Sequence, residues 1–140
     1  PQPLATGATM PRALLEPCIG VPLLGDGMLA GCGNSFVLAE TTPDALPDAT
    51  PDLAAFRAAA SAWDHARYPG GAARLPIYLW AHSGDATLDA RMFSPLSGTV
   101  EDAATGSAAT PLAALLHARR QGSAFTITQG VRMGRPSTLH

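Results

Sequence analysis

The sequence predicts an α+β domain in which a mixed or antiparallel sheet wraps around one buried central helix, with a further helix at the periphery. Three observations predict this class. Several short apolar runs end at Gly, Pro or turn residues, as strands do. Segment 107–120 is apolar on almost its whole circumference, whereas segment 50–67 is apolar on one side. A helix that is apolar all round has to be enclosed, so we expect the sheet to surround it.

The bulk composition limits the classes of protein to consider. The chain has 140 residues, 46% of them hydrophobic and 14% charged, which is typical of one globular domain. The net charge is −2 and the basic residues are scattered arginines, so we expect no nucleic-acid partner. No apolar run approaches the roughly 20 residues of a membrane span, so we expect no membrane partner and a cytoplasmic location.

The strands are predicted from short runs rich in β-branched and aromatic residues. The two runs on either side of a Ser-Gly-Asp turn, 75–83 and 86–95, predict an antiparallel hairpin. Residues 1–10 are expected to form an extended lead-in, and 96–106 a turn. Further strands are predicted at 34–40 and 124–130, and the opening of one more at 137–139.

Prolines and caps define the remaining elements. Pro17 and Pro22 interrupt segment 13–24, which predicts a broken strand or a loop with a short helical piece. In segment 50–67, Thr50 is the expected N-cap and Pro51 suits the first helical position. Its apolar stripe consists of Leu53, Phe56, Ala60 and Trp63.

The stretch EDAATGSAAT, residues 101–110, carries the candidate chemistry. The start of a helix has free backbone N–H groups and a partial positive charge, which bind carboxylates and phosphates. Gly106 allows close approach of an anion, and Thr105 and Ser107 add hydroxyl groups. Asp102 stands just before this cradle, and a carboxyl beside a bound anion tends to keep its proton. Asp102 is therefore a candidate proton donor.

A simpler interpretation of the same stretch is structural. Asp102, Thr105 and Ser107 are residues that commonly cap helices. Glu101 is expected to be a solvated or structural charge rather than a catalyst.

Three ordered motifs resemble the second half of the PhzF-like family, a phenazine-biosynthesis isomerase group with the diaminopimelate epimerase fold. Arg91, Phe93 and Pro95 are similar to the family's RxFxP strand end. Residues 101–108 are similar to its EDPxTGSA turn, and residues 129–137 to its QGxxMGRPS turn.

The resemblance implies two similar domains, each with a sheet around one central helix and with the active site between them. It implies that Asp102 is an active-site acid and that Thr105, Gly106, Ser107 and Gly130 bind a small substrate through its carboxylate. The implied reaction is proton abstraction and redelivery next to that carboxylate, with no metal and no organic cofactor.

The sequence departs from the family pattern in ways that bear on activity. Ala103 stands where the family has proline, and also where diaminopimelate epimerases have a cysteine, which disfavours a two-cysteine epimerase. No segment resembles the glutamate base and histidine of the family's first domain. Residues 1–140 are thus expected to be a single C-terminal domain that lacks the last strands.

Because acid–base isomerisation needs an acid and a base across one carbon, we expect this domain to be inactive alone. It is expected to act with an N-terminal half-domain or a homodimer partner. The alternative is a non-catalytic small-anion-binding or self-associating module derived from the same family.

Other chemically capable residues favour structural roles. Cys18 and Cys32 form no disulfide framework and lie at no metal-ligand spacing, so two reduced thiols are expected. Trp63 and Trp80 are expected in the core or an interface, and His82 at a strand end. Arg135 could pair with a substrate anion or hold Asp102, and it ranks below the backbone cradle.

Overall fold

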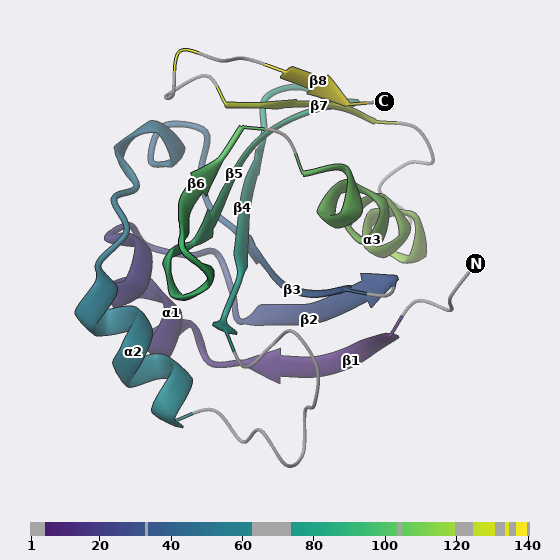
Figure 1. The fold of residues 1–140 in the computed structure, drawn as a ribbon. Coiled ribbons are helices and arrows are strands. Elements are labelled where there is room, and N and C mark those ends of the chain that lie inside the picture. The colour runs from purple at the N-terminus through teal and green to yellow at the C-terminus, as the bar shows by residue number, and fades with distance from the viewer. Residues whose placement is uncertain are drawn as a thin grey trace.

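A computed structural model describes most of the chain. The described residues are 5–32, 34–62, 74–103, 105–119, 125–130, 134 and 137–139, with the backbone alone at 5–8, 31, 32, 34, 35, 106, 107 and 139. The predicted fold class is confirmed: a mixed sheet curves around the helix α3 (Gly106–Ala118), and two helices cover the other face (Figure 1).

Eight strands form one sheet in the described part of the chain. The order is β1-β2-β3-β4-β5-β7-β8, and β6 pairs with β5 off this path. The pairs β3–β4 and β5–β7 are parallel and the others are antiparallel. The strands are β1 (Ala5–Met10), β2 (Gly27–Cys32), β3 (Asn34–Glu40), β4 (Ile77–His82), β5 (Thr87–Ser94), β6 (Thr99–Asp102), β7 (Thr126–Gln129) and β8 (Ser137–Leu139).

Strand alternation divides the core into two clusters. On β4, Tyr78 and Trp80 pack with α3, whereas Ile77 and Leu79 pack with the helices α1 (Arg12–Ile19) and α2 (Leu53–Ala62). Successive side chains of a strand point to opposite faces of the sheet, so the central strands β3, β4 and β5 each contribute to both clusters. This arrangement explains why β4 reads as a continuous apolar run.

The helix α3 is enclosed on one side rather than all round. Its buried residues include Ala108, Leu112, Leu115 and Leu116, and Ala113 and Ala114 are half-buried. Thr110, His117, Ala118 and Arg119 are exposed. The expectation of burial on all sides is therefore wrong for the outer side of the helix, because the sheet curves around only part of its circumference.

Four elements were not predicted as they occur. Residues 12–19 form the helix α1, which accommodates Pro17 and ends at Gly20 with φ of 73°. The expected lead-in contains β1, the expected 96–106 turn contains β6, and β2 begins at Gly27, directly after Asp26. A Cβ at Gly27 would lie 2.5 Å from Cδ1 of Leu15 on α1 and 2.7 Å from Cγ1 of Val37, so a larger residue there would force these side chains to shift.

The predicted helix of segment 50–67 is confirmed over Leu53–Ala62 as α2, with a different cap, and residues 63–67 lie outside the described residues. The carboxylate of Asp52 accepts a hydrogen bond from the Ala55 backbone N–H at 3.0 Å, so Asp52 rather than Thr50 caps the helix. The Thr50 backbone N–H instead donates to the carbonyl oxygen of Ile19 and ties α2 to α1. Phe56 and Ala60 are buried, whereas Leu53 is 43% exposed. Trp63 lies outside the described residues.

Cys18 is a buried thiol between α1 and α2. Its Sγ donates to the carbonyl oxygen of Leu14 at 3.3 Å. Burial, and then the negative charge of Asp52, raises the pKa of the Cys18 thiol from 9.0 to about 11. The reactive form of a cysteine is the thiolate, so Cys18 is held in its unreactive state.

We predict that Cys18 resists thiol reagents in the folded chain. In a Cys32→Ser background at about pH 8, an aromatic disulfide reagent should titrate no thiol before unfolding and one thiol after it. Because the folded pKa is raised, the stability that this group contributes should be present below pH 9 and lost as pH rises toward 11. This pH dependence is checked by comparing the free energy of unfolding of the Cys32→Ser chain with that of the Cys18→Ala/Cys32→Ser chain across this range. Rapid labelling of native Cys18 would contradict the prediction.

Candidate functional site

The turn between β6 and α3 holds the predicted acid. Asp102 is the last residue of β6 and pairs with Met92 of β5. Thr105 stands at the N-cap of α3, but its side chain makes no capping hydrogen bond. Its hydroxyl instead donates to Oδ2 of Asp102 at 2.8 Å. For Thr105, the capping interpretation is therefore wrong: this side chain holds the Asp102 carboxylate.

A buried glutamine organises this turn. Gln129, at the end of β7, is 0% exposed. Its Oε1 accepts hydrogen bonds from the Thr105 backbone N–H and from the Tyr78 hydroxyl, both at 3.1 Å. Its Nε2 donates to the Asp102 carbonyl oxygen at 2.8 Å and to the Thr105 hydroxyl at 3.0 Å. Both donors and both lone pairs of the amide are thus used, which is the requirement for a stable buried polar group.

Tyr78 links the turn to the middle of the sheet. Its ring is fully buried on β4. Burial, and then the negative charge of Asp102, raises the pKa of the Tyr78 phenol well above its usual range. Tyr78 therefore stays a neutral donor to Gln129 and is unsuited to proton transfer near neutral pH.

The strand β8 closes the turn from the other side. The Ser137 hydroxyl lies 2.7 Å from the carbonyl oxygen of Ala103 and 3.4 Å from that of Gln129. Gly130, which follows Gln129, is buried and has a φ of 84°. That conformation strongly favours glycine and turns the chain away at the site.

The start of α3 faces this turn. The backbone N–H groups of Ala108 and Ala109 bond to the Thr105 carbonyl oxygen, at 3.1 and 3.2 Å. Helix geometry leaves Gly106 and Ser107, the first two helical residues, without intrahelical acceptors for their N–H groups. With the Thr105 N–H used by Gln129, these two N–H groups are the donors that α3 can offer to an anion.

Glu101 is engaged in a structural ion pair. Arg91 forms a bidentate pair with it, with Nε to Oε2 at 3.1 Å and Nη2 to Oε1 at 2.8 Å. Arg91 Nη1 also donates to the carbonyl oxygens of Leu46, Pro47 and Ala49. Arg91 thereby ties β6 to the 3-10 turn η1 (Leu46–Asp48). Losing Glu101 would leave the buried charge of Arg91 without its ion-pair partner, which costs about 3–5 kcal/mol.

The structure brings together most of the residues that the sequence singled out. Asp102, Thr105 and Gly130 lie around one turn, and Gly106 and Ser107 begin the helix beside it. Arg135 and the side chain of Ser107 lie outside what the structure describes. Sequence reasoning missed Tyr78 and the role of Gln129. No motif marks Tyr78, whereas Gln129 is the first residue of the QGxxMGRPS-like turn, and that motif is the signal that points to it.

The described residues contain no group of three or more His, Cys, Asp or Glu that could hold a metal ion. Within the same part of the chain, no helix is long and apolar enough to cross a membrane.

A sheet that curves around a central helix is also the fold of known relatives of this chain. The family model described as phenazine biosynthesis-like protein (PhzC-PhzF) matches residues 28–140. The chain belongs to this family, and the resemblance inferred from three motifs is confirmed.

Two curated relatives are similar over a short stretch. The trans-2,3-dihydro-3-hydroxyanthranilate isomerases of Pseudomonas aeruginosa and Pseudomonas chlororaphis are 58% identical over 53 and 52 residues. These stretches are 36% and 35% of this chain and 19% of each relative. The chain therefore matches a small part of each enzyme.

Solved structures are similar over nearly the whole chain. A predicted epimerase from Pseudomonas aeruginosa has a TM-score of 0.73 at 25% identity, and a PhzF-family phenazine biosynthesis protein of Bacillus anthracis has 0.71 at 16%. Each match covers 97% of this chain and 47% of the other, so the chain spans about half the length of these proteins.

We predict that Gln129→Leu destabilises the chain by about 2–5 kcal/mol, because it leaves the Tyr78 hydroxyl and the Thr105 N–H buried without an acceptor. Thr99→Val, at an exposed position of β6, should stay within about 0.5 kcal/mol of the parent. Denaturant unfolding measures both.

Combining Gln129→Leu with Tyr78→Phe tests whether the two residues stabilise the chain through their shared hydrogen bond. Tyr78→Phe removes the orphaned hydroxyl, so the double variant should lose less stability than the sum of the single losses, by about 1 kcal/mol. Additive losses would show that Gln129 and Tyr78 are not coupled.

Proposed function

We propose that the chain is the C-terminal domain of a PhzF-like isomerase or epimerase that transfers a proton next to a substrate carboxylate. The observation that carries the proposal is the Asp102 carboxylate held by Thr105 beside the start of α3. Membership of the family supports it. The match to one half of solved relatives supports the assignment as a single domain of a larger unit.

In this proposal the backbone of α3 binds the substrate carboxylate. The N–H groups of Gly106 and Ser107, with the partial positive charge of the helix start, are the donors. The turn at Gly130 borders the same space. Thr105 contributes to the site by holding Asp102 in place, because its hydroxyl donates to Asp102 and its N–H donates to Gln129. The substrate is a small carboxylate.

Asp102 is the proposed proton donor. A bound carboxylate beside it favours the protonated form of Asp102, because two like charges repel. A base takes a proton from the carbon next to the substrate carboxylate, and Asp102 returns a proton to the substrate. Glu101 is paired with Arg91 and Tyr78 keeps its proton, so neither is that base. We propose that a first domain or a second copy of the chain supplies it, in the cytoplasm and with neither metal nor organic cofactor.

A proton-exchange assay tests this proposal. The probe is trans-2,3-dihydro-3-hydroxyanthranilate in D₂O, with deuterium uptake followed by NMR. Residues 1–140 alone should give none. Adding the first half of the Pseudomonas aeruginosa isomerase as a separate chain should give uptake, and Asp102→Asn should slow it by about 10²–10⁴-fold. Asp85→Asn, at an exposed position of the β4–β5 turn, is the matched control.

Three results would count against the proposal. Robust uptake by residues 1–140 alone would show that no second group is needed. Unchanged uptake with Asp102→Asn would reduce Asp102 to a structural residue. A mixture that binds small carboxylates at Gly106 and Ser107 but never exchanges a proton would favour the non-catalytic anion-binding module.

A further inference from the structure

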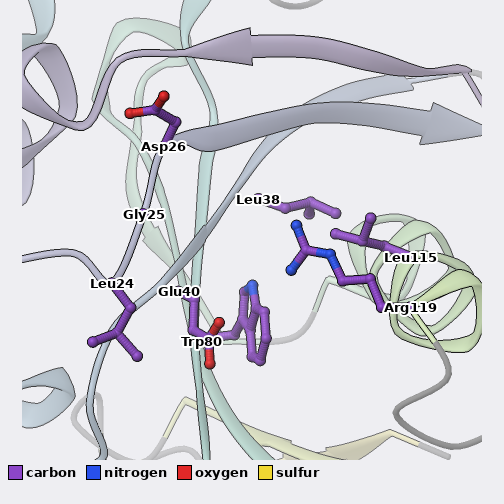
Figure 2. Close-up of a pocket in the computed structure, with 8 residues that line it drawn as sticks. All are labelled: Leu24, Gly25, Asp26, Leu38, Glu40, Trp80, Leu115 and Arg119. Carbon is purple, nitrogen blue, oxygen red and sulfur yellow. The ribbon is translucent and has the colours of Figure 1, made fainter.

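A second candidate site lies at the opposite end of α3 from Asp102. A pocket of about 240 Å³ opens between the C-terminal end of α3 and strands β3 and β4 (Figure 2). The 13 residues of α3 separate the two ends of the helix by about 20 Å. Pockets for drug-sized ligands usually measure about 300–1,000 Å³, so this one suits a smaller molecule.

A buried indole donor faces this pocket. Trp80 is 1% exposed, and its ring is held edge-on against His82 with centroids 5.3 Å apart. Its Nε1–H finds no hydrogen-bond acceptor among the described residues, and Figure 2 shows this nitrogen turned toward the space that Arg119 also enters. Because buried indole N–H groups usually have a partner, this orphaned donor indicates a ligand acceptor in the pocket.

Charged groups of both signs surround the same space. The Glu40 carboxylate and the Arg119 guanidinium make no ion pair or hydrogen bond within the described residues. Asp26 uses one carboxylate oxygen, Oδ1, to accept the Arg12 backbone N–H at 3.0 Å. The carbonyl end of α3 adds a partial negative charge, so negative groups outnumber positive ones.

We propose that this pocket binds a free amino acid, with basic amino acids preferred. The ligand carboxylate bonds to Trp80 Nε1–H and Arg119, and its α-ammonium pairs with Glu40. Leu38 and Leu115 line the pocket beside the aliphatic part of the ligand. The ammonium group at the end of a basic ligand side chain pairs with Asp26. A ligand with a basic side chain therefore binds more tightly than one with a neutral or acidic side chain.

Tryptophan fluorescence tests the proposal directly. Trp63 is the other tryptophan of the chain, so a Trp63→Phe background leaves Trp80 as the single reporter. L-lysine should change its emission saturably, with a Kd of about 1 mM or tighter. L-leucine should bind more weakly, and L-glutamate, acetate and n-butylamine should bind weakest.

Variants of the two charged residues identify the pocket. Glu40→Gln and Arg119→Gln should each raise the Kd for L-lysine about tenfold. Arg57→Gln, at an exposed position of α2 on the other face of the sheet, should leave it unchanged. Arg119 is exposed, so its substitution tests the pocket even where Glu40→Gln lowers the melting temperature.

The proposal is overturned by any of three outcomes. The first is the absence of a saturable fluorescence change with L-lysine up to about 10 mM. The second is binding of L-glutamate or acetate that is as tight as binding of L-lysine. The third is a Kd for L-lysine that Arg119→Gln leaves unchanged.

Discussion

The candidate catalytic turn depends on one buried amide, that of Gln129. Its four hydrogen bonds join β7 to the carbonyl oxygen of Asp102, to the backbone and hydroxyl of Thr105, and to Tyr78 on β4. A buried polar group is tolerated only when its bonds are made, so this network accepts one arrangement of the turn. The arrangement orients the Thr105 hydroxyl toward Asp102 and leaves the N–H groups of Gly106 and Ser107 at the open end of α3.

The alternation of a strand explains why two neighbouring acids differ in role. Glu101 and Asp102 are consecutive residues of β6, so their side chains leave opposite faces. Glu101 pairs with Arg91, which also donates to the carbonyl oxygens of Leu46, Pro47 and Ala49. Asp102 meets Thr105 at the start of α3. The first acid anchors β6 to the sheet, and this anchoring holds the second one in place.

Sequence reasoning succeeded where local signals are strong. The runs at 34–40, 75–83 and 86–95 are rich in apolar, β-branched or aromatic residues, and they form β3, β4 and β5. The small residues of β1 and β2 give no such signal, because these strands are defined by their pairing. The Asp102–Thr105 turn is local and carries a motif. The bond of Gln129 to Tyr78 joins residues 51 positions apart, and no spacing in the sequence reveals it.

We propose that Gln129 keeps the start of α3 ready for an anion. Amide chemical shifts of Gly106 and Ser107 during a titration with benzoate, at constant ionic strength, test it most directly. We expect saturable shifts of these two amides in the parent chain and at least about tenfold weaker binding in Gln129→Leu. Shifts of equal size and midpoint in Gln129→Leu, or amides that do not respond to benzoate in the parent chain, would contradict it.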